Sequence, residues 1–487
     1  MAKQVYQQIY EDILSKINVM HFRPGAKLPP ERQLIKQYNA SDTSVRRALA
    51  MLVEQGYIVK RHGSGNYVCG KVTADSSEGN PDIVFVVPSH FGINIGLSEL
   101  RRSLSLELPG LKIKILVLDK PSLEPEQARR LIEYYRKPFV ILNSRNQTAE
   151  MAKEGLLAPL ESIAHMDERV DRMPDNLKWL FNGLHGEMKY FGCPYLYTST
   201  CFAINVDLAE KAGLDVAHPP RLWSELFHWG RIFTEWRDSK GYHDLSAFYG
   251  YHRDFISSVE AFYFMAMDGE PWAVQDEEFR RGLNEFFAFV EGLLDGGMME
   301  TVANQAPDPF VSCKYLFSLQ AGSWYPRDIS KFRPEMRCRF LPFPVPSARR
   351  PRFSACGTEL LSLMLPDDKK KAGMEVIRLL DALFSPAICE QLAWRFGCLP
   401  ADPQLSRRFL QTNPGMEPFY DALFTSLEPH CMEDEALTNK LNEIFKRRLD
   451  SNKMRLDASA AEEYLSFASG ILSHFTSQNS LKKEMLA

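Results

Sequence analysis

The hydrophobic positions in the first seventy residues predict three helices followed by a hairpin. Apolar side chains recur at every fourth position from Val5 to Ile17, which is the spacing of an amphipathic helix. A second helix is expected from Pro30 to about Tyr38, because proline suits a first helical position. Ser41 is a favoured N-cap residue and predicts the start of a third helix. Two short strands, 57–60 and 66–68, are expected around a Gly-Ser-Gly turn.

Beyond residue 80 the pattern changes to alternating strands and helices. Residues 73–80 are small and polar without periodicity, and are interpreted as a linker. Short β-branched apolar runs at 83–87, 113–118 and 139–142 predict strands, and 125–136 predicts one of the helices between them. This order is typical of a largely parallel sheet in an α/β domain.

Polar residues follow two of these predicted strands. In open parallel sheets, ligands bind beyond the carboxyl ends of the strands. We therefore expect a ligand near these ends, although ordinary loop polarity is the alternative for any one of the residues. The candidates are Ser89, His90, Asn143, Ser144 and Arg145.

Charge separates the two parts of the chain. Residues 1–72 hold eleven Lys or Arg and five Asp or Glu, a net charge of +6. The whole chain carries −4, so the remainder carries −10. A basic head attracts duplex phosphates, whereas an acidic body does not, and this predicts that DNA is bound at the N-terminal end.

Composition indicates a cytoplasmic location. No apolar run approaches twenty residues, and the N-terminus is polar and amphipathic, so neither a membrane segment nor a signal peptide is expected. Nine cysteines without a C-x-x-C pair fit reduced thiols. Eleven histidines show no ligand spacing, and we therefore predict no metal.

Three segments of the head together resemble the winged helix-turn-helix of GntR-family bacterial repressors. Pro-Gly-x-x-Leu-Pro-x-Glu-Arg-x-Leu at 24–34, Ser-x-x-x-Val-Arg-x-Ala-Leu at 41–49, and Gly-x-Gly-x-Tyr-Val at 63–68 match the family pattern in order. The resemblance implies binding to double-stranded operator DNA. The DNA contacts that it implies are Arg32, Ser41, Thr43, Ser44, Arg46, Arg47, His62 and Gly63.

Within this set, Arg46 resembles the arginine that reads the major groove in the family. A bidentate contact of this kind to guanine discriminates by about 1–3 kcal/mol. Asp42 departs from the family, where a basic residue is common, and this leaves the operator sequence open. A winged helix that contacts proteins is the alternative, which the net charge of the head disfavours.

The rest of the chain resembles the extracellular solute-binding proteins of ABC importers. Gly-Leu-Leu-Ala-Pro-Leu at 155–160, Gly-Cys-Pro-Tyr at 192–195, Leu-Trp-Ser-Glu-Leu at 222–226 and Gly-Cys-Leu-Pro at 397–400 follow the family's order. The resemblance implies two α/β lobes, joined by crossings near 195–202 and 354–359, that close over a ligand. A signal peptide like that of the family is not expected, and Ile204 and Val206 replace a Tyr and a Lys of its pattern.

Many such proteins bind sugars by stacking the pyranose ring on an aromatic face. The resemblance therefore gives Tyr195, Tyr197 and Trp324 as candidate ligand contacts, in addition to the polar residues at the strand ends. Trp324 stands in a Gly-Ser-Trp context near an expected lobe junction, although core packing is the usual role of a single tryptophan. Trp223 is assigned to the core.

These expectations define a multidomain protein. We expect a winged helix-turn-helix domain at 1–72, a linker at 73–80, and a two-lobed α/β periplasmic-binding-protein-like domain at 81–487. The expected function is a ligand-responsive transcription regulator, a homodimer, with a sugar or glycoside effector in the interlobe cleft and no cofactor. A DNA-localised scaffold for a peptide or protein partner is the alternative. A fused PLP enzyme is disfavoured because no lysine stands in a Ser-x-Ser-Lys context.

Overall fold

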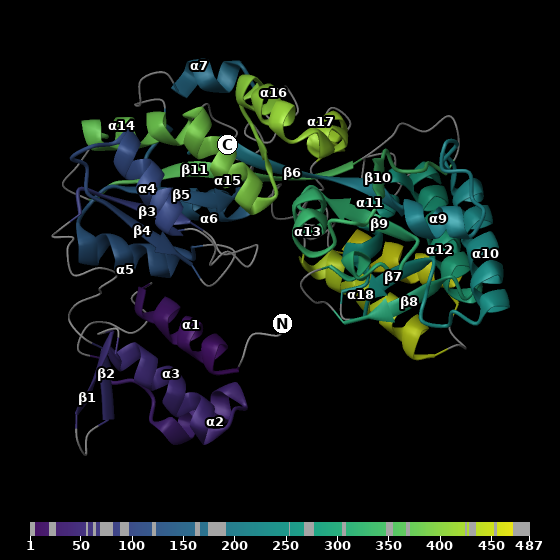
Figure 1. Cartoon of the computed structure of the whole chain (residues 1–487), viewed down its shortest axis with the longest axis horizontal. Coiled ribbons are helices and arrows are strands. Elements are labelled where there is room, and N and C mark those ends of the chain that lie inside the picture. The colour runs from purple at the N-terminus through teal and green to yellow at the C-terminus, as the bar shows by residue number, and fades with distance from the viewer. Residues whose placement is uncertain are drawn as a thin grey trace. The chain divides into compact units, whose positions relative to one another are not determined.

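The structure is a computed structural model of the 487-residue chain, drawn in Figure 1. The residues that it describes are 5–18, 26–54, 57–61, 65–68, 81–87, 97–118, 123–160, 166–173, 191–252, 254–266, 277–303, 308–346, 354–366, 371–423, 426–427, 435–451 and 455–470.

The head contains the three helices and the hairpin that the sequence predicts. They are α1 (Val5–Asn18), α2 (Glu31–Tyr38), α3 (Asp42–Glu54), β1 (Ile58–Arg61) and β2 (Gly65–Val68). Pro30 is the N-cap residue of α2, as its missing amide hydrogen favours. The Ser41 hydroxyl accepts a hydrogen bond from the Ser44 amide at 3.2 Å, which confirms the predicted cap of α3.

One apolar core holds the head together. The apolar stripe of α1, including Ile9, Ile13 and Ile17, packs with Leu34 of α2 and Val45 of α3 in the same buried cluster. β1 and β2 pair antiparallel, and Ile58 and Val68 from this hairpin lie opposite each other and reach the same core. The winged helix-turn-helix fold is therefore present in the described residues.

The contacts within the chain divide it into two compact units. Unit 1 comprises 1–197, 358–396 and 400–405, and unit 2 comprises 198–357, 397–399 and 406–487. The chain changes unit at five points. Two of them, Tyr197–Thr198 and Gly357–Thr358, fall within the segments where crossings are expected from the sequence, and the other three, at 396–397, 399–400 and 405–406, were not expected.

In addition to the head, unit 1 contains an α/β sheet with the strand order β11-β5-β3-β4. β3 pairs parallel with β4 and with β5, whereas β11 pairs antiparallel with β5. The elements of this part are β3 (Ile83–Val87), α4 (Leu97–Glu107), β4 (Ile113–Val117), α5 (Pro125–Tyr135), β5 (Phe139–Ser144), α6 (Arg145–Lys153), α7 (Met166–Asp171), β11 (Ser354–Met364), α14 (Met374–Leu383), α15 (Pro386–Phe396) and β12 (Leu399–Pro400). β11 and β12 cross the boundary, since 354–357 and Leu399 belong to unit 2.

Helices cover both faces of this sheet. Ala128 and Leu131 of α5 pack on one face, in a buried cluster with Val84 of β3, Leu116 of β4 and Phe139 of β5. In Figure 1, α14 and α15 lie on the other side of the strands from α5. All five residues of β3 are buried, which explains why its sequence is a continuous apolar run.

Unit 2 is built around the end of the long strand β6 (Gly192–Asn205), which pairs antiparallel with β9 and β10. A separate parallel pair is formed by β7 and β8. The remaining elements are α9 (Val206–Lys211), α10 (Trp223–Lys240), β7 (Phe248–Tyr251), α11 (Ile256–Ala266), α12 (Glu277–Asp295), β8 (Met299–Val302), η2 (Pro309–Ser312), β9 (Phe317–Gly322), α13 (Tyr325–Phe332), β10 (Cys338–Leu341), α16 (Pro403–Thr412), η3 (Pro414–Met416), α17 (Glu417–Leu423), β13 (Ser426–Leu427) and α18 (Glu435–Asp450).

Aromatic packing and a buried arginine stabilise unit 2. The indole of Trp223 lies 4.4 Å from the ring of Phe289, centroid to centroid, and donates a hydrogen bond to the Pro344 carbonyl at 2.9 Å, so Trp223 is a core residue as expected. Arg448 of α18 pairs with Glu291 of α12 at 2.8 Å and ties the two helices together. No helix in the described part of the chain is long and apolar enough to span a bilayer.

Candidate functional site

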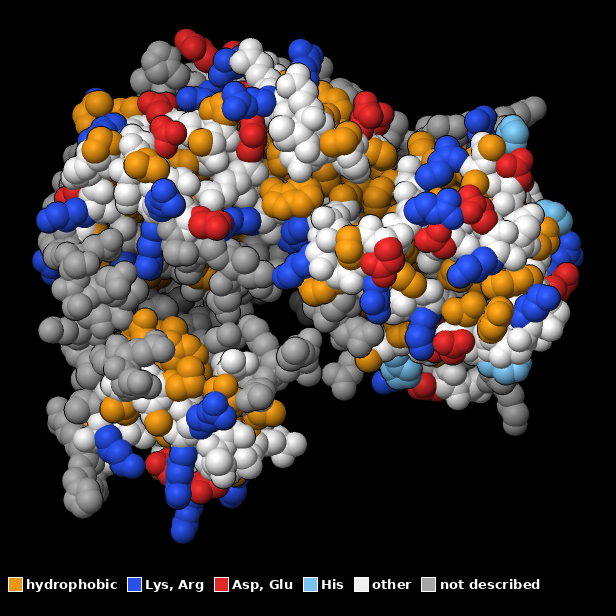
Figure 2. All heavy atoms as spheres, viewed as in Figure 1, with side chains coloured by type: hydrophobic (Ala, Val, Ile, Leu, Met, Phe, Trp, Pro, Cys, Tyr) orange, Lys and Arg blue, Asp and Glu red, His pale blue; other side chains and the backbone are white. Residues whose placement is uncertain are grey.

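Most of the residues that are expected to contact DNA lie at or near the start of α3, and Arg32 lies on α2. Of these, Arg32, Ser41, Thr43, Arg46 and Arg47 are exposed, and Ser44 is half-buried. In Figure 2, basic side chains with a few acidic ones among them lie over the part of the head that holds α2 and α3. His62 and Gly63 lie outside the described residues.

Arg46 is exposed and bound by two carboxylates. Its Nε donates a hydrogen bond to Glu31 at 3.0 Å, and its terminal nitrogen lies 3.2 Å from a carboxylate oxygen of Asp42. The hydrogen bond to Glu31 and the charge of Asp42 raise the pKa of Arg46. The side chain is nevertheless 64 % exposed, so part of the guanidinium remains accessible to a ligand.

Arg47 has a different environment from Arg46. Its guanidinium carbon lies 3.9 Å from the centre of the Tyr6 ring, a cation–π contact between α3 and α1. This contact fixes Arg47 toward the side of the recognition helix that carries α1.

Asn143 and Ser144, which the sequence placed after a strand, are the last two residues of β5, and Arg145 is the first residue of α6. Asn143 is fully buried, and its side chain accepts a hydrogen bond from the Leu123 amide at 3.3 Å and donates to Met151 Sδ at 3.2 Å. Ser144 is the N-cap residue of α6. Arg145 is 5 % exposed. Ser89 and His90, the candidates after β3, lie outside the described residues.

The candidate aromatic residues fall in different environments. Tyr195 and Tyr197 are both 0 % exposed in unit 1, so neither ring presents a face to solvent in this structure. The Tyr195 hydroxyl donates to the Leu383 carbonyl at 2.6 Å, and burial raises its pKa well above the usual value. Trp324, in unit 2, is half-buried.

Two glycines leave the space that Trp324 occupies at the start of α13. A Cβ atom at Gly322 would lie 2.2 Å from the indole ring, and one at Gly397 would lie 2.4 Å from the Trp324 Cβ. Gly397 also has a φ of +65°, a conformation that favours glycine. The Gly-Ser-Trp and Gly-x-Leu-Pro segments of the sequence therefore meet around this indole.

Behind Trp324 lies a tyrosine network that the sequence pattern did not identify. The hydroxyl of Tyr249 donates to Asp308 at 2.5 Å and lies 2.7 Å from the hydroxyl of Tyr325, the residue that follows Trp324. Tyr251 donates to the other oxygen of Asp308 at 2.5 Å. Burial first, and then the charge of Asp308, raise the pKa values of Tyr249 and Tyr325, so both phenols stay protonated.

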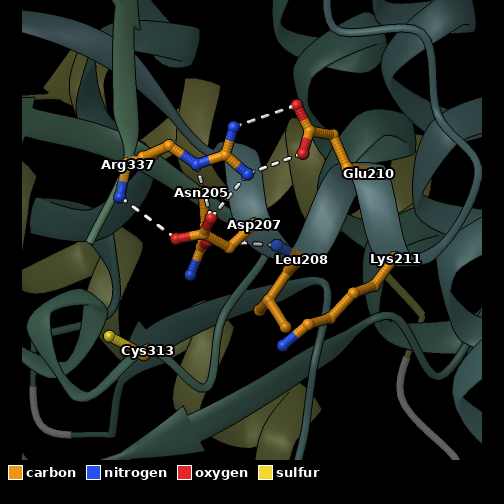
Figure 3. Close-up of a pocket in the computed structure, with 7 residues that line it drawn as sticks. All are labelled: Asn205, Asp207, Leu208, Glu210, Lys211, Cys313 and Arg337. Carbon is orange, nitrogen blue, oxygen red and sulfur yellow. Dashed lines mark hydrogen bonds and ion pairs between the residues drawn. The ribbon is translucent and has the colours of Figure 1, made fainter. Parts of the chain in front are cut away.

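A pocket of about 470 Å³ opens elsewhere on unit 2, beside the start of α9. Figure 3 shows Arg337 between two carboxylates, with Lys211 pointing away from them. Arg337 bonds Asp207 at 2.7 Å and Glu210 at 2.6 Å, and the latter hydrogen bond lowers the pKa of Glu210. These charged groups satisfy one another. In the described segments, no group of three or more His, Cys, Asp or Glu is placed to hold a metal ion.

Comparisons with known proteins agree with the two folds. Residues 5–68 match the family described as bacterial regulatory proteins, gntR family, and residues 109–304 match the bacterial extracellular solute-binding proteins. Neither is a family of enzymes.

Two curated relatives each match less than a fifth of this chain. The Uxu operon transcriptional regulator of Escherichia coli K12 is 35% identical over 82 residues, which is 16% of this chain and 32% of the relative. The Exu regulon transcriptional regulator of the same strain is 39% identical over 66 residues, which is 14% of this chain and 26% of the relative. The chain thus spans between a quarter and a third of the length of these relatives.

Two solved structures each match about four fifths of this chain. The GacH receptor of Streptomyces glaucescens, solved unliganded and with acarbose, is 17% identical at a TM-score of 0.59, over 80% of this chain and 99% of that one. UgpB of Mycobacterium tuberculosis with glycerophosphocholine is 16% identical at a TM-score of 0.60, over 82% of this chain and 100% of that one. At these identities the likeness shows the fold. The chain therefore joins a DNA-binding domain of the gntR family of bacterial regulatory proteins to a bacterial solute-binding protein domain.

Proposed function

We propose that the chain is a transcription regulator whose affinity for operator DNA responds to a small solute bound by its solute-binding protein domain. The observation that carries the proposal is the presence, in one chain, of an exposed Arg46 at the start of a gntR-family recognition helix and of a domain from a family that binds solutes. A DNA-binding domain acts on chromosomal DNA, so the proposed location is the cytoplasm.

A carbohydrate is the proposed class of solute. Half-buried Trp324, held at a helix start by two glycines, is the candidate aromatic face for a sugar ring. The structural relative from Streptomyces glaucescens was solved with acarbose, and one from Arthrobacter globiformis is a cyclic α-maltosyl-1,6-maltose binding protein. Because UgpB was solved with glycerophosphocholine, phosphodiesters belong in any ligand screen beside the sugars.

A homodimer is the proposed assembly on DNA. Helix-turn-helix proteins that bind as dimers read two half-sites about one helical turn apart, and the symmetry of the operator then mirrors that of the protein. The head of one chain presents one recognition helix, α3. Mass photometry on operator duplexes with one and with two half-sites measures the number of chains bound.

The proposal is tested by screening the full-length protein for ligands and for DNA. Thermal unfolding is measured against a panel of mono- and oligosaccharides, glycosides and glycerophosphodiesters, and a bound solute raises the midpoint because it stabilises the folded state by mass action. Selection from random duplexes identifies the operator. The expected result is at least one stabilising carbohydrate and one enriched duplex motif. A protein that binds neither is not a regulator of this kind.

A further inference from the structure

The two acids that contact Arg46 occupy only some of the hydrogen-bond donors of its guanidinium. A guanidinium carries five N–H donors. The Nε donor bonds Glu31 at 3.0 Å, and one terminal nitrogen lies 3.2 Å from Asp42. The geometry therefore leaves donors on the terminal nitrogens, which are the ones that can bond O6 and N7 of a guanine together.

The two acids approach the guanidinium from different helices. Asp42 precedes Arg46 by four residues, which places the two side chains on one face of α3. Glu31 lies in the first turn of α2, so its contact depends on the packing of α2 against α3. An arginine side chain that is bonded from two sides has fewer accessible rotamers than an exposed arginine without such contacts.

Both acids stand where the duplex is expected. Asp42 is 49 % exposed and begins the recognition helix, so its charge opposes DNA phosphates. On electrostatic grounds alone, Asp42 weakens DNA binding, because neutralising its charge strengthens binding to any sequence. An acid in the first turn of a helix also suits the positive end of the helix dipole, so this structural effect of Asp42 has to be separated from any effect on base reading.

We propose that Asp42, together with Glu31, is a positioning residue that orients Arg46 for one guanine, and so lowers overall DNA affinity while raising base discrimination. This inference rests on the proposed binding of operator DNA.

The test is a double-mutant cycle between Asp42→Asn and Arg46→Ala in the full-length protein. Dissociation constants are measured for the selected operator and for duplexes with single substitutions, at three salt concentrations. Wild type is expected to prefer guanine at one position by about 5- to 150-fold. Asp42→Asn is expected to reduce that preference several-fold, with the same salt slope and equal or tighter binding to unrelated DNA.

The cycle separates positioning from charge. In the Arg46→Ala background, Asp42→Asn is expected to leave the remaining base preferences unchanged, because there is no arginine left to orient. Glu126→Gln is the matched control, since Glu126 also pairs with an arginine four positions away, Arg130, but on α5. Thermal unfolding of each variant checks that the head is folded.

Three outcomes are decisive. Loss of the guanine preference in Asp42→Asn, absent from the control and from the Arg46→Ala background, supports the inference. Tighter binding to all duplexes by the same factor, with the preference intact, overturns it. If wild type binds no duplex at all, the proposed DNA-binding function itself has failed, which is a different result from either of these.

Discussion

At the scale of single residues, Arg46 is the side chain that we propose to read the DNA sequence. It is exposed, stands in the second turn of α3, and contacts the carboxylates of Glu31 and Asp42. Arg47, the next residue, is turned onto the Tyr6 ring instead. Two adjacent arginines in the sequence thus have different roles in the structure.

The change Arg46→Ala is expected to remove preference for the operator while leaving salt-dependent binding. Base contacts specify a sequence, whereas phosphate contacts are shared by every duplex. The expected loss is about 1–3 kcal/mol of discrimination. Competition between operator and unrelated DNA measures it, with Arg32→Ala as a comparison that removes an exposed arginine of α2. Full selectivity in Arg46→Ala would show that another residue reads the groove.

The contacts of Arg46 show which side-chain pairs can be predicted from the sequence and which cannot. The Asp42–Arg46 pair follows from helical spacing and was open to prediction. The Glu31 contact was not, because it joins positions fifteen residues apart across two helices. The contacts of Asp308 are harder still to predict from the sequence, since its tyrosine partners lie 57 and 59 residues away and only the fold brings them together.

At the scale of elements, short segments with strong periodicity were predictable and long crossing strands were not. β3, β4 and β5 are buried on both faces, so their sequences are apolar runs that indicate strands directly. β6 contains a proline and several polar residues over fourteen positions and is recognised only through its pairing with β9 and β10. The crossings between the lobes were expected from the resemblance to solute-binding proteins, because periodicity does not predict them.

The start of α13 gives a prediction about packing. Gly322→Ala is expected to displace the Trp324 indole, because the new Cβ would lie 2.2 Å from the ring. The free energy of unfolding should fall by about 1–3 kcal/mol, the usual cost of overpacking. Chemical denaturation measures the change. Gly415→Ala is the matched control, since its added Cβ would lie 3.8 Å from the nearest side chain. Equal stability of the two variants would mean that the indole is not confined.

A buried carboxyl on β11 gives a prediction about pH. Burial raises the pKa of Glu359 to about 8, above its value in an unfolded chain. The folded state therefore binds this proton more tightly, and the carboxyl's contribution to stability is full below about pH 4.5 and declines as pH rises to about 8.

Glu359→Gln is accordingly expected to raise the free energy of unfolding at pH 8 by about 1 kcal/mol or more and to change it little at pH 4.5. Urea denaturation at the two pH values measures this. Glu107→Gln, at an exposed position of α4, is the control and should show no such difference. A stability gain that is the same at both pH values would show that the charge of Glu359 is not its cause.

At the scale of the whole molecule, the central claim is coupling between solute binding and DNA binding. Coupling between two sites is reciprocal, so a solute that weakens operator binding must itself bind more weakly to the operator complex. The usual range of 1–3 kcal/mol corresponds to about a 5- to 150-fold change in operator affinity. Weaker DNA binding in the presence of a sugar is the proposed direction.

The most direct measurement is the operator dissociation constant of full-length protein with and without a stabilising carbohydrate, for wild type and for Trp324→Ala. We expect the carbohydrate to weaken operator binding about 5-fold or more in wild type and to leave it unchanged in Trp324→Ala, with equal solute-free affinity in both proteins. Thermal unfolding confirms that the variant is folded. A carbohydrate that binds wild type and leaves its operator affinity unchanged would show that the two binding sites are not coupled.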